Sequence, residues 1–133
     1  MAQSDAQSPT VFVIDDNADV RASIAGLLKS VGLRAETFES AQEFLSRERS
    51  DEPGCLVLDF TLLSMSGFEV QRQLSDAGVQ IPIIFISACD DVPTSARAMK
   101  SGATTFLTKP FDDQALLDAI QEALNRDRTM RQR

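Results

Sequence analysis

Short apolar runs alternate along the chain with segments in which apolar residues recur every three or four positions. The first run, residues 11–14, is followed by such a segment, which ends at Gly32. The apolar residues of this segment are Val20, Ile24, Leu27, Leu28 and Val31. This pattern predicts a strand followed by a helix.

The same unit recurs along the rest of the chain. Further strands are predicted at residues 34–38, 55–58, 83–86 and 105–108. A serine followed three positions later by glutamate, at Ser40 and at Ser66, predicts two helix starts, and Asp91 ahead of Pro93 predicts another, ended by Gly102. The last helix begins at about Asp112, and its apolar face carries Leu116, Leu117, Ile120 and Leu124.

Five strands alternating with five helices indicate a parallel sheet that is covered on both faces. The first, third and fourth strands are almost entirely apolar, which is typical of strands buried on both faces. The second contains Arg34, Glu36 and Thr37, and the fifth is short, so we expect both at the sheet edges. The sequence therefore predicts an α/β, flavodoxin-like (βα)5 sandwich with strand order 2-1-3-4-5.

The length of 133 residues suits one domain. We expect a loose extension at residues 1–9, the domain at 10–125, and a basic tail or the start of a linker at 126–133. No apolar run approaches the roughly 18 residues of a membrane span, and no basic, apolar leader opens the chain. Two cysteines without a CxxC pair, and no histidine, support neither a disulfide framework nor a zinc site. The expected location is the cytoplasm.

The formal net charge is −7, although the last eight residues are basic. An acidic body would repel a phosphate backbone. Direct nucleic-acid binding by this domain is therefore not expected.

Polar side chains directly follow four of the predicted strands. Asp15 and Asp16 follow the first strand, Asp59 the third, Ser87 the fourth and Lys109 the fifth. The carboxyl ends of parallel strands form the ligand crevice of an open sheet, so these groups are expected to converge. Clustered carboxylates need a neutralising cation, and oxygen ligands without imidazole or thiolate favour a hard ion such as Mg²⁺.

These groups suit phosphoryl transfer, in which Lys109 supplies a charge and Ser87 a hydroxyl donor. Asp59 is the best candidate nucleophile because it ends the central strand, whereas Asp15 and Asp16 form a metal-holding pair on the neighbouring strand. Structural interpretations stay open for each residue. The aspartate pair could cap a helix, Asp59 could belong to a turn, Ser87 could be a loop hydroxyl and Lys109 a solvated charge.

Four motifs together resemble the response-regulator receiver domain over about residues 10–125. They are VIDDN at 13–17, LD at 58–59 with Gly67 eight residues after Asp59, SA at 87–88, and FLTKPF at 106–111. The resemblance implies that a sensor histidine kinase phosphorylates Asp59. It also implies Mg²⁺ (or Mn²⁺) bound directly by Asp16, Asp59 and the backbone carbonyl of Thr61, with Asp15 contributing largely through water.

The resemblance further implies a switch. In the family, the residue matching Ser87 turns toward the phosphoryl group and the aromatic residue matching Phe106 rotates inward, which alters the face formed by the fourth helix, fifth strand and fifth helix. A packing role for Phe106 is the structural interpretation. A cis bond between Lys109 and Pro110 is also implied, and would aim the lysine inward. A homodimer through the altered face is a further hypothesis.

The segment 98–103, AMKSGA, followed by Phe106, is most similar to receivers of the FixJ/NarL type. The outputs of those receivers are LuxR-type DNA-binding domains, so control of transcription through a domain outside this chain is expected. Leu63 departs from the family, in which a proline is common, and Cys89 lies in a loop that usually contains glycine. Cys89 is not expected to belong to the site.

Three other functions are alternatives to this one. A stand-alone receiver that shuttles phosphoryl groups or acts as an interaction switch would share the same site. A haloacid-dehalogenase-type phosphatase needs a second acid two residues after the nucleophile, where Thr61 stands. A flavin or nucleotide binder needs a glycine- or hydroxyl-rich phosphate loop where Asp15, Asp16 and Asn17 lie. We therefore expect a phosphoacceptor that assists its own phosphorylation and dephosphorylation, and not an enzyme.

Overall fold

The computed structural model describes residues 9–47, 54–59, 67–87 and 105–131. Its five strands form one sheet in the order β2-β1-β3-β4-β5, and all neighbouring strands are parallel. The strands are β1 (Thr10–Ile14), β2 (Arg34–Phe38), β3 (Gly54–Asp59), β4 (Ile83–Ser87) and β5 (Thr105–Thr108). The predicted fold class and strand order are confirmed.

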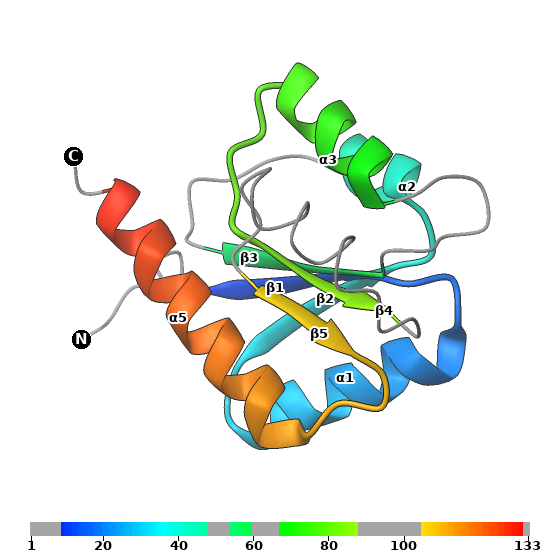
Figure 1. Ribbon diagram of the computed structural model, residues 1–133, viewed down its shortest axis with the longest axis vertical. Helices are drawn as coiled ribbons and strands as arrows, with labels where there is room; N and C mark the ends of the chain where they lie inside the picture. Colours follow the sequence, from blue (N-terminus) through cyan, green and yellow to red (C-terminus); the bar gives the residue numbers. More distant parts are fainter. Residues whose placement is uncertain (1–8, 48–53, 60–66, 88–104, 132–133) are drawn as a thin grey trace.

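Helices cover both faces of the sheet (Figure 1). They are α1 (Ala18–Ser30), α2 (Ala41–Ser46), α3 (Gly67–Asp76) and α5 (Asp113–Arg131). Helices α1 and α5 lie on one face, and α2 and α3 lie on the other. The helix predicted at 91–102 lies outside the described residues. No helix in the described part of the chain is long and apolar enough to cross a membrane.

Alternate residues of the central strands fill two apolar layers, because successive side chains of a strand point to opposite faces. The layer under α1 and α5 includes Val11, Val13, Val57, Ile84, Ile86, Leu28, Leu116 and Ile120. The layer under α2 and α3 includes Phe12, Ile14, Leu56, Leu58, Phe85, Phe44, Val70 and Leu74. The central strands are thus buried on both sides, and the polar side chains at their ends stand at the rim of the core.

Helix α1 begins and ends at residue types that are typical of helix ends, an asparagine and a glycine. The side chain of Asn17 accepts hydrogen bonds from the backbone N–H groups of Asp19 and Val20, as an N-cap residue does. At the other end Gly32 has φ +81°, a conformation that favours glycine, and it turns the chain toward β2. Val31 was predicted on the apolar face of this helix, and that prediction is wrong. Val31 is the C-cap residue and is 50% exposed, because the chain leaves the helical path there.

The last helix continues beyond the boundary expected at residue 126. Helix α5 runs to Arg131, and Asp127 within it is 2% exposed. The carboxylate of Asp127 accepts a hydrogen bond from the backbone N–H of Gly54, the first residue of β3, at 2.9 Å. Helix α5 therefore includes the first residues of the expected basic tail, and Asp127 among them packs against the start of β3.

Candidate functional site

Three carboxylates meet at the carboxyl ends of two neighbouring strands, β1 and β3. Asp15 follows β1, Asp16 is the next residue, and Asp59 is the last residue of β3. The parallel register pairs Ile14 with Leu58, so the residue after each lies at the same edge of the sheet. One carboxylate oxygen from each of the three aspartates lies within 4.8 Å of the others. The structure therefore brings together the three acids that the sequence singled out.

Lys109 reaches this acid cluster from the segment that joins β5 to α5. Its Nζ atom lies 3.2 Å from Oδ2 of Asp15 and 3.9 Å from Oδ2 of Asp59. Its backbone N–H donates to the carbonyl oxygen of Ser87 at 2.6 Å, which joins the segment to the end of β4. The Lys109–Pro110 peptide bond is cis. A lysine from one edge of the sheet thus stands beside acids from its centre.

Every polar atom of Asp15 is bound by a different segment of the chain. Its backbone N–H donates to the carbonyl oxygen of Phe38 in β2, and its carbonyl oxygen accepts from Nη1 of Arg21 in α1 at 2.6 Å. Oδ1 accepts from the backbone N–H of Asn17, and Oδ2 faces Lys109. Asp15 is fully buried. It is therefore held rigidly, with its carboxylate already engaged on both oxygens.

The donor set fits a hard divalent cation. Two of the three carboxylates are buried and the third, Asp16, is half-buried, so their negative charges lie close together in a partly desolvated site. Lys109 offsets only part of that charge. The oxygen-only cluster matches the preference of Mg²⁺ and Mn²⁺. Thr61, the remaining expected ligand, lies outside the described residues.

Ser87 and Phe106 lie on the two strands beside the acid cluster. Ser87 ends β4, is buried, and is in register with Thr108 of β5. Phe106 in β5 is half-buried and packs against the apolar layer under α2 and α3. Its ring lies 6.3 Å from that of Phe85, which in turn lies 6.1 Å from Phe68 of α3. Phe106 therefore packs against the core, as expected if its role is structural.

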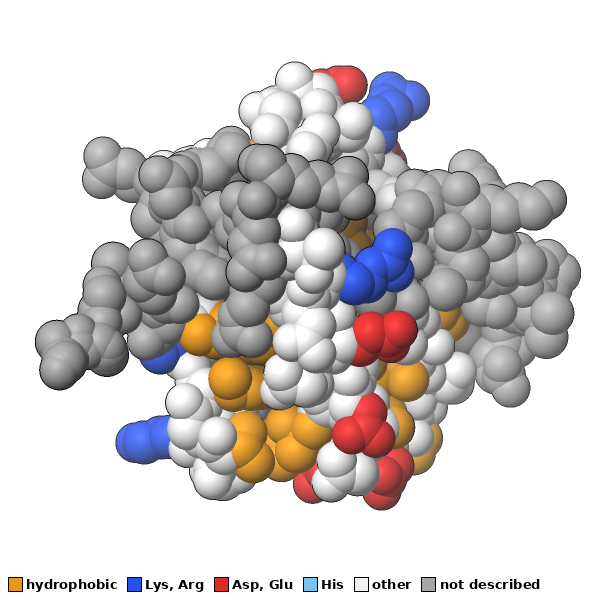
Figure 2. Space-filling model, turned by 90° about the vertical axis from the view of Figure 1, so that its left-hand side faces the viewer, with side chains coloured by type: hydrophobic (Ala, Val, Ile, Leu, Met, Phe, Trp, Pro, Cys, Tyr) orange, Lys and Arg blue, Asp and Glu red, His pale blue; other side chains and the backbone are white. Residues whose placement is uncertain are grey.

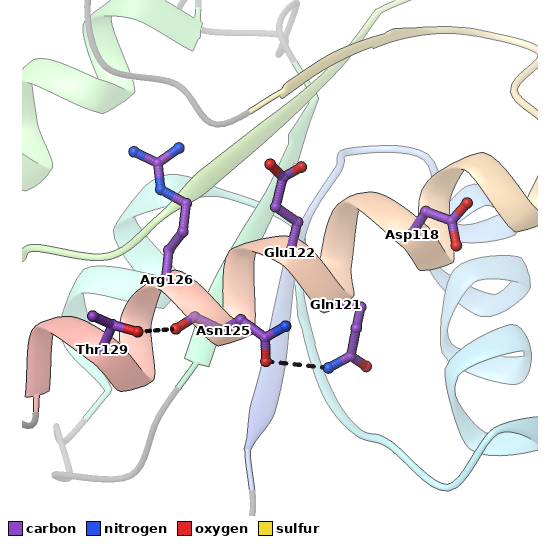
Figure 3. A pocket seen from close by; sticks show the side chains of 6 residues that line it. All are labelled: Asp118, Gln121, Glu122, Asn125, Arg126 and Thr129. Atoms are coloured by element: carbon purple, nitrogen blue, oxygen red, sulfur yellow. Dashed lines mark hydrogen bonds between the residues drawn. The ribbon is translucent and has the colours of Figure 1, made fainter.

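The outer face of α5 is polar and separate from the acid cluster. Figure 2 shows side chains of both charge signs on this side of the molecule, with apolar side chains visible between them. A shallow hollow runs along the helix (Figure 3). Within it the hydroxyl of Thr129 donates to the carbonyl oxygen of Asn125, and Nε2 of Gln121 donates to Oδ1 of Asn125. The lining residues are Asp118, Gln121, Glu122, Asn125, Arg126 and Thr129. None of them belongs to the acid cluster.

Sequence reasoning missed two residues of this framework, Arg21 and Asp127. Arg21 stands six positions after Asp15, and a lone arginine in an amphipathic helix gives no signal of a contact with a backbone carbonyl. Asp127 was counted only as one acid in a basic tail. The burial of Asp127 could have been suspected from the apolar spacing of Ile120 and Leu124, which continues toward it on the same helix face.

Comparison with known proteins identifies the family. Residues 11–121 match the response regulator receiver domain, and the chain therefore belongs to that family. The transcriptional regulatory protein TdiR of Thauera aromatica is 48% identical over 121 residues, which are 91% of this chain and 53% of TdiR. The chain thus spans about half the length of the curated relatives that it matches.

Solved structures agree with this assignment. A structure of the response regulator StyR superposes with a TM-score of 0.86 at 50% identity, covering 94% of this chain and 63% of that one. The structure described as FixJ-N superposes with a TM-score of 0.79 at 38% identity, covering 90% and 95% of the two chains. These relatives support the receiver domain of a two-component system and none of the alternatives considered from the sequence.

Proposed function

We propose that Asp59 accepts a phosphoryl group from a sensor histidine kinase in a reaction that requires Mg²⁺ or Mn²⁺. The observation that carries the proposal is the position of Lys109, whose ammonium group stands beside both Asp15 and Asp59. A cation brought to an acid cluster from a distant strand is a costly arrangement for structure alone, because charges must be desolvated to form it. It is well suited to phosphoryl transfer, in which positioning and charge neutralisation do most of the work.

In this reaction a carboxylate oxygen of Asp59 attacks the phosphorus of the kinase phosphohistidine. The new P–O bond forms an acyl phosphate, the P–N bond breaks, and its electron pair remains on the histidine nitrogen. Lys109 pairs with one phosphoryl oxygen as the phosphoryl group moves onto Asp59, and the Ser87 hydroxyl donates to another. A metal ion held by Asp16 and Asp59, with Asp15 acting through water, would neutralise the remaining phosphoryl charge.

The proposed consequence is a change of surface. Ser87 moves toward the phosphoryl group, Phe106 rotates inward, and the face formed by β5, α5 and the helix predicted at 91–102 changes shape. Because TdiR is a transcriptional regulatory protein about twice as long as the matched region, the proposed output is transcription through a LuxR-type DNA-binding domain in a longer protein. A homodimer through the same face, in the cytoplasm, is part of this proposal.

The site assignment can be tested by trapping the acyl phosphate. The protein is incubated with acetyl phosphate and Mg²⁺ and then reduced with borohydride, which converts a phosphorylated aspartate to homoserine. Peptide mass spectrometry then locates the converted residue. We expect conversion at residue 59 alone. Conversion at residue 15 or 16, or none in the wild-type protein under any condition, would contradict the proposal.

A further inference from the structure

Arg21 makes a contact that neither residue type nor spacing predicts. It lies in the first turn of α1, where its own backbone N–H donates to the carbonyl oxygen of Asn17. Its half-buried side chain turns back toward β1, and Nη1 donates to the carbonyl oxygen of Asp15 at 2.6 Å. The contact joins the helix to the backbone of the acid cluster.

The accepting carbonyl belongs to the peptide group that links Asp15 to Asp16. The other polar atoms of Asp15 are held by β2, by the N-cap turn and by Lys109. Arg21 therefore restrains the plane of this peptide group. That plane, together with the φ and χ angles of Asp16, sets the direction in which the Asp16 side chain leaves the backbone.

We propose that Arg21 is a positioning residue of the metal site, which holds the Asp15–Asp16 peptide so that the Asp16 carboxylate stays beside that of Asp59. The inference rests on the proposed function of the acid cluster. A guanidinium suits this position because it is more weakly hydrated than an ammonium group and tolerates partial burial. Its hydrogen bond to the carbonyl is charge-assisted, and groups that orient metal ligands in this way affect metal affinity strongly.

A purely structural role makes a different prediction. If Arg21 only fastens the first turn of α1 to β1, its removal lowers the free energy of unfolding but leaves the metal affinity of the folded protein unchanged. If Arg21 orients Asp16, replacing Arg21 lowers the metal affinity even under conditions in which the variant and the wild type are both fully folded. Metal binding by folded protein therefore separates the two roles.

The experiment is a Mn²⁺ titration followed by electron paramagnetic resonance, with each protein shown to be folded at the assay temperature by circular dichroism. Arg21→Met is compared with the wild type and with Lys29→Met. Lys29 is an exposed cation in the last turn of the same helix, about 12 Å along its axis from Arg21. We expect Arg21→Met to bind Mn²⁺ about tenfold more weakly, and Lys29→Met to bind within about twofold of the wild type.

A second variant, Arg21→Lys, keeps the charge but not the planar fork, and we expect an intermediate affinity. If Arg21→Met does not fold, Arg21→Lys takes its place in the comparison with the wild type and Lys29→Met. Arg21 variants that bind Mn²⁺ as tightly as the wild type, or more tightly, would overturn the inference, as would an equal loss in Lys29→Met. Absence of Mn²⁺ binding by the wild-type protein would instead count against the proposed function itself.

Discussion

The carboxylate of Asp127 accepts a hydrogen bond from the backbone N–H of Gly54, 73 positions earlier in the chain, at 2.9 Å. Asp127 lies in the C-terminal part of α5, and Gly54 begins β3. The opposite end of that strand carries Asp59, the proposed phosphoacceptor. The last helix is thus joined to the central strand by a buried hydrogen bond as well as by apolar packing.

Replacing Asp127 tests the strength of this link. We expect Asp127→Ala to lower the free energy of unfolding by about 1–3 kcal/mol, because the buried N–H of Gly54 loses its acceptor. Urea unfolding followed by circular dichroism measures the change. The control is Asp118→Ala on the exposed face of the same helix, for which we expect a change within about 0.5 kcal/mol. Equal effects of the two substitutions would show that the buried contact contributes little.

Replacing each of two glycines by alanine is expected to change the free energy of unfolding in opposite directions. A Cβ atom at residue 54 would lie 2.8 Å from the carbonyl oxygen of Thr10 and 3.0 Å from Cε2 of Phe12, so we expect Gly54→Ala to destabilise the fold by about 1–3 kcal/mol. A Cβ atom at Gly26, inside α1, meets nothing within 4 Å. Gly26→Ala is therefore expected to stabilise by about 0.5–1 kcal/mol. Thermal unfolding of the two variants checks both signs, and a stabilising Gly54→Ala would contradict the packing described here.

Cys55 should be chemically inert in the folded protein. Burial, and then the negative charge of Asp127, raise the pKa of its thiol from 9.0 to about 12. The thiolate is the nucleophilic form, so we expect very slow alkylation of Cys55 by iodoacetamide at pH 8.5 and fast alkylation in urea. Mass spectrometry of the peptide that contains Cys55 measures the rate. Fast alkylation of the folded protein would show that this strand is more accessible than its burial indicates.

The same pKa shift makes stability depend on pH at the alkaline end. Since the thiol ionises in the unfolded chain at about 9.0 but in the folded chain only at about 12, the unfolded state releases a proton first. The stability associated with the neutral thiol is therefore present below pH 9 and is lost as the pH rises toward 12. We expect the wild type to lose more stability over this range than Cys55→Ala, measured by urea unfolding, because other alkaline titrations are common to both proteins. An identical decline in the two would contradict the raised pKa.

The central strands could be predicted because each one corresponds to a short run of apolar residues in the sequence. A strand buried on both faces must be apolar throughout, so β1, β3 and β4 were visible as apolar runs, and the polar residue ending each run marked the rim of the sheet. Parallel pairing then brought Asp15 and Asp59 together. The contacts of Asp127 and Arg21 were missed because their partners are a distant backbone N–H and a backbone carbonyl, which residue type does not reveal. Helical spacing indicates only that Asp127 lies on the buried face of α5. Val31 fitted the helical period, but Gly32 ends the helix before that position is buried.

Lys109 is expected to affect metal binding and phosphorylation in opposite directions. Lys109→Met removes the cation beside Asp15 and Asp59, so the acid cluster should bind Mg²⁺ more tightly, and Mg²⁺ should raise the melting temperature of the variant by more than that of the wild type. Phosphorylation by acetyl phosphate should slow about a hundredfold, because a donor to the developing phosphoryl charge is lost. Thermal unfolding in a Mg²⁺ series and the rate of adduct formation measure the two effects.

Lys29→Met serves as the control for this prediction, since it removes an exposed cation of the same type at the far end of α1. It should change neither the response to Mg²⁺ nor the phosphorylation rate by more than about twofold. A Lys109→Met protein that is phosphorylated at the wild-type rate would show that the lysine only stabilises the fold.

The central claim is that Asp59 is a metal-dependent phosphoacceptor, and intact-protein mass spectrometry after incubation with acetyl phosphate tests it most directly. The wild-type protein with Mg²⁺ is compared with the same protein in EDTA and with Asp59→Asn in Mg²⁺. We expect a single labile phosphoryl adduct in the first sample and none in the other two. An adduct that persists in Asp59→Asn or in EDTA, or no adduct on the wild-type protein, would contradict the claim.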